Sequence, residues 1–163
     1  DYITVQQNIK RYLDHKSTNT NIVLRPVPQA LTIEHYYTLI DFSVAHQITL
    51  DNNNLLDPAW LRVTVLPKSY KEMIADQLRN KYAYYLALND TQSTGAINLR
   101  ASHLFDISLR NHINYLLRLL SESEPSNIIE LRRQFVKFNS TLDINDKFTA
   151  VYPNLKEFYH EYS

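Results

Sequence analysis

The stretch that decides the fold is "NIVLRPVPQALTIEHYYTLIDFSVAHQITLD", residues 21–51. It opens with the short β-branched run "IVLRPV", which predicts a strand within 21–27 that ends at Pro26 and Pro28, because proline has no backbone donor. It closes with "QITLD", which predicts a second short strand. Between the two, Thr32 can cap a helix whose apolar residues recur at helical spacing. These apolar residues are Ile33, Tyr36, Tyr37, Ile40 and Val44.

The segments on either side of this unit have helical patterns. Residues 4–15 begin with a capping box and predict a helix before the first strand. Asp57 and Pro58 form a good helix start, and Ser69 to Glu72 form a second capping box that opens a helix reaching about residue 88. Further helices are predicted over 105–120 and after Pro125, with Ile128, Ile129, Phe135 and Val136 facing inward in the second of these. A short segment, 154–162, closes the chain. The stretch 89–98, which holds the single glycine, reads as a loop.

The predicted fold class is α/β. A strand, a helix and a second strand with short connections are typical of parallel sheets. We therefore expect a partial parallel (βα) barrel-like unit with two short strands over residues 1–66. An all-helical C-terminal cap over 67–163 follows in the same compact domain. Two strands cannot satisfy their edges alone, so this polypeptide or a partner chain is expected to supply more strands.

Composition narrows the classes of function. The chain has 163 residues, with 17 basic and 17 acidic side chains, and this balance argues against a nucleic-acid partner. It contains no cysteine, so it cannot itself supply a thiolate nucleophile or iron–sulfur ligands. No apolar run approaches the roughly 18 residues of a membrane-spanning helix, and no signal peptide is visible. We therefore expect a cytoplasmic protein without a membrane partner. The first residue is Asp1, so we expect a chain that is processed, trimmed or part of a longer polypeptide.

Most familiar site patterns are missing. His35 and His46 are eleven residues apart on one predicted helix, too far along it to share a metal, and His103 and His112 fail in the same way. These histidines are expected to be solvated or hydrogen-bonded. There is no glycine-rich phosphate loop and no nucleophile elbow.

The better candidates lie where the two strands end. Ligands of parallel α/β sheets bind outside the carboxyl ends of the strands, and these ends carry Arg25, Asp51, Asn52 and Asn53. Arg25 can clamp a carboxylate, and the other three can bond to ribose or amide groups. The alternative is an asparagine-rich turn with no ligand, since asparagine tolerates turn geometry.

The order of segments resembles the later part of radical S-adenosylmethionine enzymes of the twitch kind. The matching segments are "VQQNIKRYL", "NIVLRPV", "IEHYYTLIDFSV", "ITLDNNNLL", "DPAWL" at 57–61 and "LP" at 66–67. The closing stretch "LDINDKFTAVYPNLKEFY" resembles the C-terminal Leu-Asp pair of that family and its Phe-Pro-Glu-Leu segment. The resemblance implies that the prolines turn the chain from the last strands of a partial barrel into a helical cap.

Two motifs of that family do not occur in the chain, and both lie upstream in the family. One is Cys-x-x-x-Cys-x-x-Cys, which binds a [4Fe–4S] cluster, and the other is Gly-Gly-Glu-Pro, which holds S-adenosylmethionine. Leu31 and Thr32 also stand near a position where an asparagine is common. The resemblance thus implies the C-terminal half of such an enzyme, not catalytic alone, with a small-molecule or unknown substrate. The second hypothesis is a stand-alone binding or structural module that completes its sheet against a partner chain.

Overall fold

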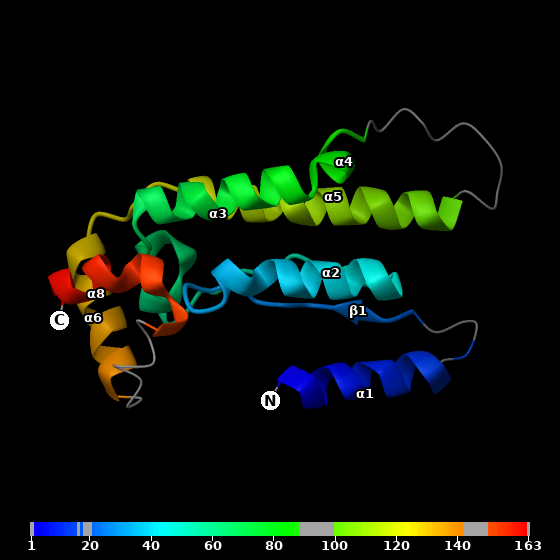
Figure 1. The fold of residues 1–163 in the computed structure, drawn as a ribbon, viewed down its shortest axis with the longest axis horizontal. Coiled ribbons are helices and arrows are strands. Elements are labelled where there is room, and N and C mark those ends of the chain that lie inside the picture. Colours follow the sequence, from blue (N-terminus) through cyan, green and yellow to red (C-terminus); the bar gives the residue numbers. More distant parts are fainter. Residues whose placement is uncertain (1, 16, 18–20, 89–99, 142–149, 163) are drawn as a thin grey trace.

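The structure is a computed structural model that describes residues 2–15, 17, 21–88, 100–141 and 150–162. Figure 1 shows α1, α2, α3 and α5 running along the long axis of the molecule, with α6 and α8 at one end. The elements are α1 (Tyr2–His15), β1 (Val23–Leu24), η1 (Ile33–His35), α2 (Tyr36–His46), β2 (Thr49–Leu50), η2 (Ala59–Leu61), η3 (Val63–Val65), α3 (Lys68–Lys81), α4 (Ala83–Leu86), α5 (Arg100–Ser121), α6 (Ile128–Thr141), η6 (Pro153–Leu155) and α8 (Lys156–Tyr162). The described part is mostly helical.

The two predicted strands pair in parallel. Val23 lies opposite Thr49 and Leu24 lies opposite Leu50, and the Asp51 N–H donates to the Leu24 carbonyl at 2.8 Å. The pairing confirms two adjacent parallel strands. The strands are shorter than predicted, because Pro26 supplies no backbone donor beyond Arg25 and the asparagines after Asp51 turn toward α5.

Helix α2 connects the strands and ends in a tight reversal. Gln47 has a left-handed backbone conformation, with φ of 51°, and its N–H bonds to the carbonyls of Ser43 and Val44. This is a common way to end a helix. The buried Ser43 hydroxyl donates to the Ile48 carbonyl at 2.5 Å, which fixes the entry into β2.

The helical cap differs from the prediction in three local features. Helix α3 begins at Lys68 with no side-chain cap, so the predicted capping box is not formed and Glu72 instead pairs with Lys68. The helix expected to reach residue 88 is interrupted at Tyr82, which separates α3 from α4. Pro58 precedes only the short 3₁₀ turn η2. The predicted loop 89–98 lies outside the described residues.

The core lies between the strands and the helices. Ile40, Ile74, Ile113 and Phe135 are at most 1% exposed, and α5 packs against both β2 and α3. The inward assignment of Phe135 is confirmed, but that of Ile129 is wrong, since Ile129 is 55% exposed. Adjacent helical residues point about 100° apart, so Ile128 and Ile129 cannot both face the core squarely.

Candidate functional site

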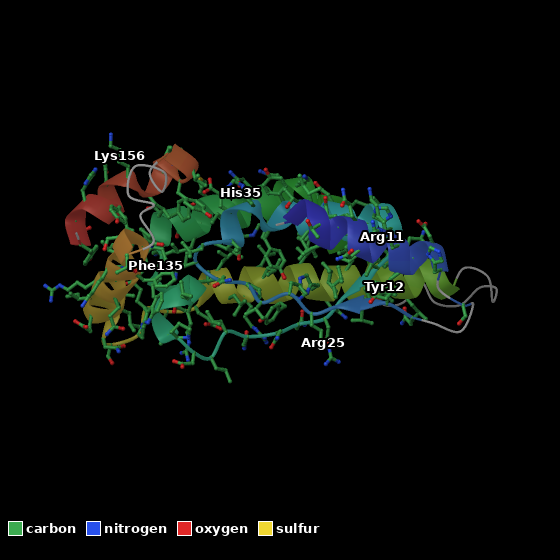
Figure 2. All side chains as sticks on the ribbon, turned by 90° about the horizontal axis from the view of Figure 1, so that it is seen from below. Arg11, Tyr12, Arg25, His35, Phe135 and Lys156 are labelled. Carbon is green, nitrogen blue, oxygen red and sulfur yellow. The ribbon has the colours of Figure 1, made fainter. Side chains whose placement is uncertain are left out.

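The parallel pairing brings the predicted strand-end residues together. Arg25 follows β1 and Asp51 follows β2, and Arg25 Nε lies 2.9 Å from Asp51 Oδ2. The Arg25 side chain is largely in solvent, with 74% of its surface exposed, and the Asp51 side chain is about half-exposed, at 46%. Figure 2 shows Arg25 pointing from the strands to the side opposite α1. The two residues thus form a charged pair at the carboxyl end of the sheet, as expected from their positions.

Asn52 connects this pair to the interior. Its backbone N–H donates to Asp51 Oδ1 at 2.9 Å, and its side-chain Oδ1 lies 2.9 Å from His112 Nδ1. His112 comes from the middle of α5 and is 1% exposed. A buried imidazole therefore holds Asn52, the second residue after β2.

Tyr36 completes a buried polar chain. Its hydroxyl lies 3.2 Å from His112 Nε2, and the two rings are stacked, with centroids 5.8 Å apart. Burial lowers the pKa of His112 to about 4, although the Asp51 carboxylate opposes this shift. Burial also raises the pKa of the Tyr36 hydroxyl, with a smaller contribution from Tyr115. The imidazole is therefore neutral, and the phenol keeps its proton.

The other asparagines are also tied to α5. The Tyr115 hydroxyl lies within hydrogen-bonding distance of the Asn53 carbonyl oxygen and of Asn54 Oδ1. Tyr115 is 6% exposed, and burial raises its pKa. Residues 52–54 are thus held against the helix by His112 and Tyr115, one turn apart on its inner face.

The sequence pointed to Arg25, Asp51, Asn52 and Asn53 but not to His112 and Tyr115, which contact the two asparagines, or to Tyr36, which contacts His112. Tyr36 carried only an apolar signal at helical spacing, and Tyr115 was not singled out. His112 was expected to be solvated or hydrogen-bonded, and the structure has it buried with both ring nitrogens in contact with polar groups. The available signal was one histidine within the apolar pattern of a long helix, which does not reveal its partners.

Two other histidines, His35 and His46, contact aromatic rings. The His35 ring centroid is 5.9 Å from that of Tyr152, and the His46 ring packs on Phe42. Within the described ranges, no three His, Cys, Asp or Glu side chains gather in a way that could hold a metal ion.

Two hollows flank the strand ends. A pocket of about 110 Å³ is lined by Asn54, Arg62 and Leu119, among others. A more apolar groove of about 430 Å³ lies beside the end of β1 and includes Pro26, His35 and Tyr36. Tyr36 therefore contacts both this groove and the buried chain to Asn52.

The resemblance to radical S-adenosylmethionine enzymes implies two groups, an iron–sulfur cluster and S-adenosylmethionine. Without cysteine, the chain offers no thiolate for an iron–sulfur cluster, so such ligands would have to come from another segment. The exposed Arg25 guanidinium and the Asn52 carboxamide do suit the carboxylate or hydroxyl groups of S-adenosylmethionine. The strand-end side chains thus offer polar groups to an organic ligand, and the chain offers no cysteine ligand to a cluster.

Comparison of the chain with models of known families, with curated proteins and with solved structures finds no match. Within the ranges that the structure describes, every helix is too short or too polar to cross a lipid bilayer.

Proposed function

We propose that this chain is the C-terminal, ligand-facing portion of a twitch-type radical S-adenosylmethionine protein. The observation that supports it best is the parallel pairing of β1 with β2, with Arg25, Asp51, Asn52 and Asn53 at the carboxyl ends. Ligand sites of parallel α/β folds lie at that end. The order of the remaining segments also resembles that of this family.

In this proposal, a further segment completes the sheet as a partial barrel. Val23 in β1 is 42% exposed, and in the described part β1 pairs only with β2. Added strands would enclose the strand-end residues and bring the cysteines that this chain lacks. The cluster and S-adenosylmethionine would supply radical chemistry, while the chain's own residues would bind polar ligand groups and the helical cap would exclude water. The proposal keeps the cytoplasmic location expected from the sequence.

A second candidate is a non-catalytic binding module that completes its sheet against a partner chain. The observation that favours it is on α1, where Val5 and Tyr12 lie two turns apart on one face and are 53% and 72% exposed. Exposed apolar side chains on one face of a helix are typical of an interface. This candidate also needs added strands but requires no cysteine.

The two candidates differ in what accompanies the chain. Antibodies against its exposed α6 surface would isolate the natural protein, whose intact mass, cysteine content and iron content are then measured. The radical enzyme predicts iron and a cysteine triad, in a polypeptide larger than 19.2 kDa or in a tightly associated second chain. Isolation with a cysteine-free, iron-free partner would support the binding module and contradict the radical enzyme.

A further inference from the structure

A buried chain of polar contacts reaches the strand end from the interior. It runs from Tyr36 on α2 through His112 on α5 to Asn52 after β2, with distances of 3.2 Å and 2.9 Å. Tyr36 is 5% exposed and His112 is 1% exposed. Water therefore has little access to these two groups, and each polar atom needs a partner from the protein.

This requirement selects one tautomer of His112. If Nδ1 carries the proton, the Tyr36 hydroxyl donates to Nε2 and Nδ1–H donates to Asn52 Oδ1, so every atom is satisfied. If Nε2 carried the proton, the Tyr36 hydroxyl would accept, and its own buried proton would have no acceptor within the residues that the structure describes. Leaving such a donor unsatisfied is costly. The Nδ1–H tautomer is thus favoured.

The tautomer fixes the orientation of the Asn52 side chain. Since Oδ1 accepts from His112, the amide NH₂ group is the part left to bind elsewhere, and it has no partner in the described part of the chain. The terminal nitrogens of Arg25 also have no partner in the described part of the chain, because its ion pair uses Nε. Both Asp51 oxygens are already engaged, one by Arg25 and one by the Asn52 N–H.

The free hydrogen-bonding groups of Arg25 and Asn52 are therefore donors. The Asp51 carboxylate, which pairs with Arg25 and accepts from the Asn52 N–H, keeps both residues at the same strand end. We propose that His112 is a positioning residue that leaves the Asn52 amide NH₂ free at this strand end, where it and the Arg25 guanidinium form a subsite for a ligand oxyanion, either carboxylate or phosphate. Guanidinium and amide donors suit such groups. The inference adds a ligand subsite to the proposed function. It rests on that function only for the further segment that would enclose the subsite.

The surroundings of His112 contain few charges. The titratable groups that face it are Tyr36 from α2, Tyr115 from α5 and Asp51 from the end of β2. Asp51 is compensated by Arg25. The tautomer therefore depends mainly on Tyr36 and Asn52.

The first experiment reads the tautomer on the full chain. Nitrogen-15 NMR of the imidazole at neutral pH is expected to show a protonated Nδ1 and an unprotonated Nε2 for His112. Tyr36→Phe is expected to reduce that tautomer, and Tyr37→Phe is the matched control that leaves it unchanged. A protonated Nε2 in the unaltered protein would overturn the assignment of His112 as the positioning residue.

The second experiment titrates inorganic phosphate and, separately, acetate, with chloride at matched ionic strength as the reference. Shifts are expected at the Arg25 Nε–H and Asn52 NH₂ resonances, and the stronger of the two anions identifies the source of the oxyanion. Asn52→Asp replaces the donor with a carboxylate and is expected to weaken binding about tenfold or more. Asn53→Asp adds the same charge one residue away and is expected to weaken it much less.

Equal weakening by the two substitutions would show a general charge effect and overturn the subsite. Shifts no larger than those caused by chloride would overturn it as well. Neither result depends on iron or cysteine, so failure of the subsite is distinguishable from failure of the proposed enzyme class.

Discussion

Nδ1 of His112 lies 2.9 Å from Oδ1 of Asn52, although the two residues are 60 positions apart in the chain. The contact joins the centre of α5 to Asn52, which comes directly after Asp51 at the end of β2. A surface turn and a buried helix face are thereby coupled. The stability of the fold and the geometry of the strand end should depend on the same imidazole.

A double-mutant cycle measures this coupling. His112→Leu leaves the buried Tyr36 hydroxyl without an acceptor, so we expect a loss of about 1–3 kcal/mol in the free energy of unfolding. Tyr36→Phe should cost about 1 kcal/mol. In the double variant no hydroxyl is left unpaired, so the combined loss should fall below the sum by about 1 kcal/mol. Urea unfolding followed by circular dichroism gives the four values, and strict additivity would contradict the contact.

The stability should also depend on pH through His112. Its pKa is about 4 in the folded protein against 6.5 ordinarily, so the unfolded chain binds more protons between these values. The contribution of His112 is thus complete above pH 6.5 and is lost as the pH falls toward 4, by up to about 3 kcal/mol. The free energy of unfolding, measured across this range, should vary less with pH in His112→Leu than in the unaltered protein. The exposed His15→Asn variant is the control and should keep the slope of the unaltered protein.

The sequence could predict the strand end but not what holds it. Proline after "IVLR" and asparagine after "ITLD" both mark local ends of strands, and two β-branched runs flanking a helix predict their parallel pairing. The partners of Asn52 depend on how α5 lies across β2, which no local pattern records. The prediction that Ile129 in α6 faces the core was wrong for a related reason. The consecutive pair Ile128 and Ile129 gives an ambiguous periodicity.

The Arg25–Asp51 pair should contribute little to stability. The Arg25 side chain is largely exposed and that of Asp51 is about half-exposed, and exposed ion pairs are worth at most about 1 kcal/mol. Arg25→Ala should therefore change the free energy of unfolding by less than that amount, while abolishing the phosphate or acetate shifts at Asn52. Thermal unfolding and NMR titration of the same sample check the two parts. A large destabilisation would show that Arg25 has a structural role instead.

Arg132 should be the arginine that matters most for the helical end of the molecule. Its Nε donates to the Val65 carbonyl at 2.9 Å, its Nη2 pairs with Glu124 at 2.5 Å, and its guanidinium lies over the Phe158 ring. Lysine cannot reproduce this forked geometry. Arg132→Lys is expected to cost about 1–3 kcal/mol, measured by urea unfolding. Arg133→Lys, at an exposed neighbouring position, should cost almost nothing, and equal effects would contradict the packing of α6.

The orientation of α6 has a direct test in its apolar residues. Phe135 is 0% exposed and Ile129 is 55% exposed. Phe135→Ala should destabilise by about 3–5 kcal/mol because it opens a cavity in the core, whereas Ile129→Ala should fall within about 0.5 kcal/mol. Thermal unfolding of both variants ranks them, and the reverse order would mean that the helix is turned about its axis.

Reductant-dependent release of 5′-deoxyadenosine from S-adenosylmethionine tests whether the chain is part of a radical S-adenosylmethionine enzyme, as proposed above. The protein isolated from its natural source under anaerobic conditions should release it, and the cysteine-free 163-residue chain alone should not. An isolated protein that contains this chain with all its partners, yet releases no 5′-deoxyadenosine with reductant present, would contradict that proposal.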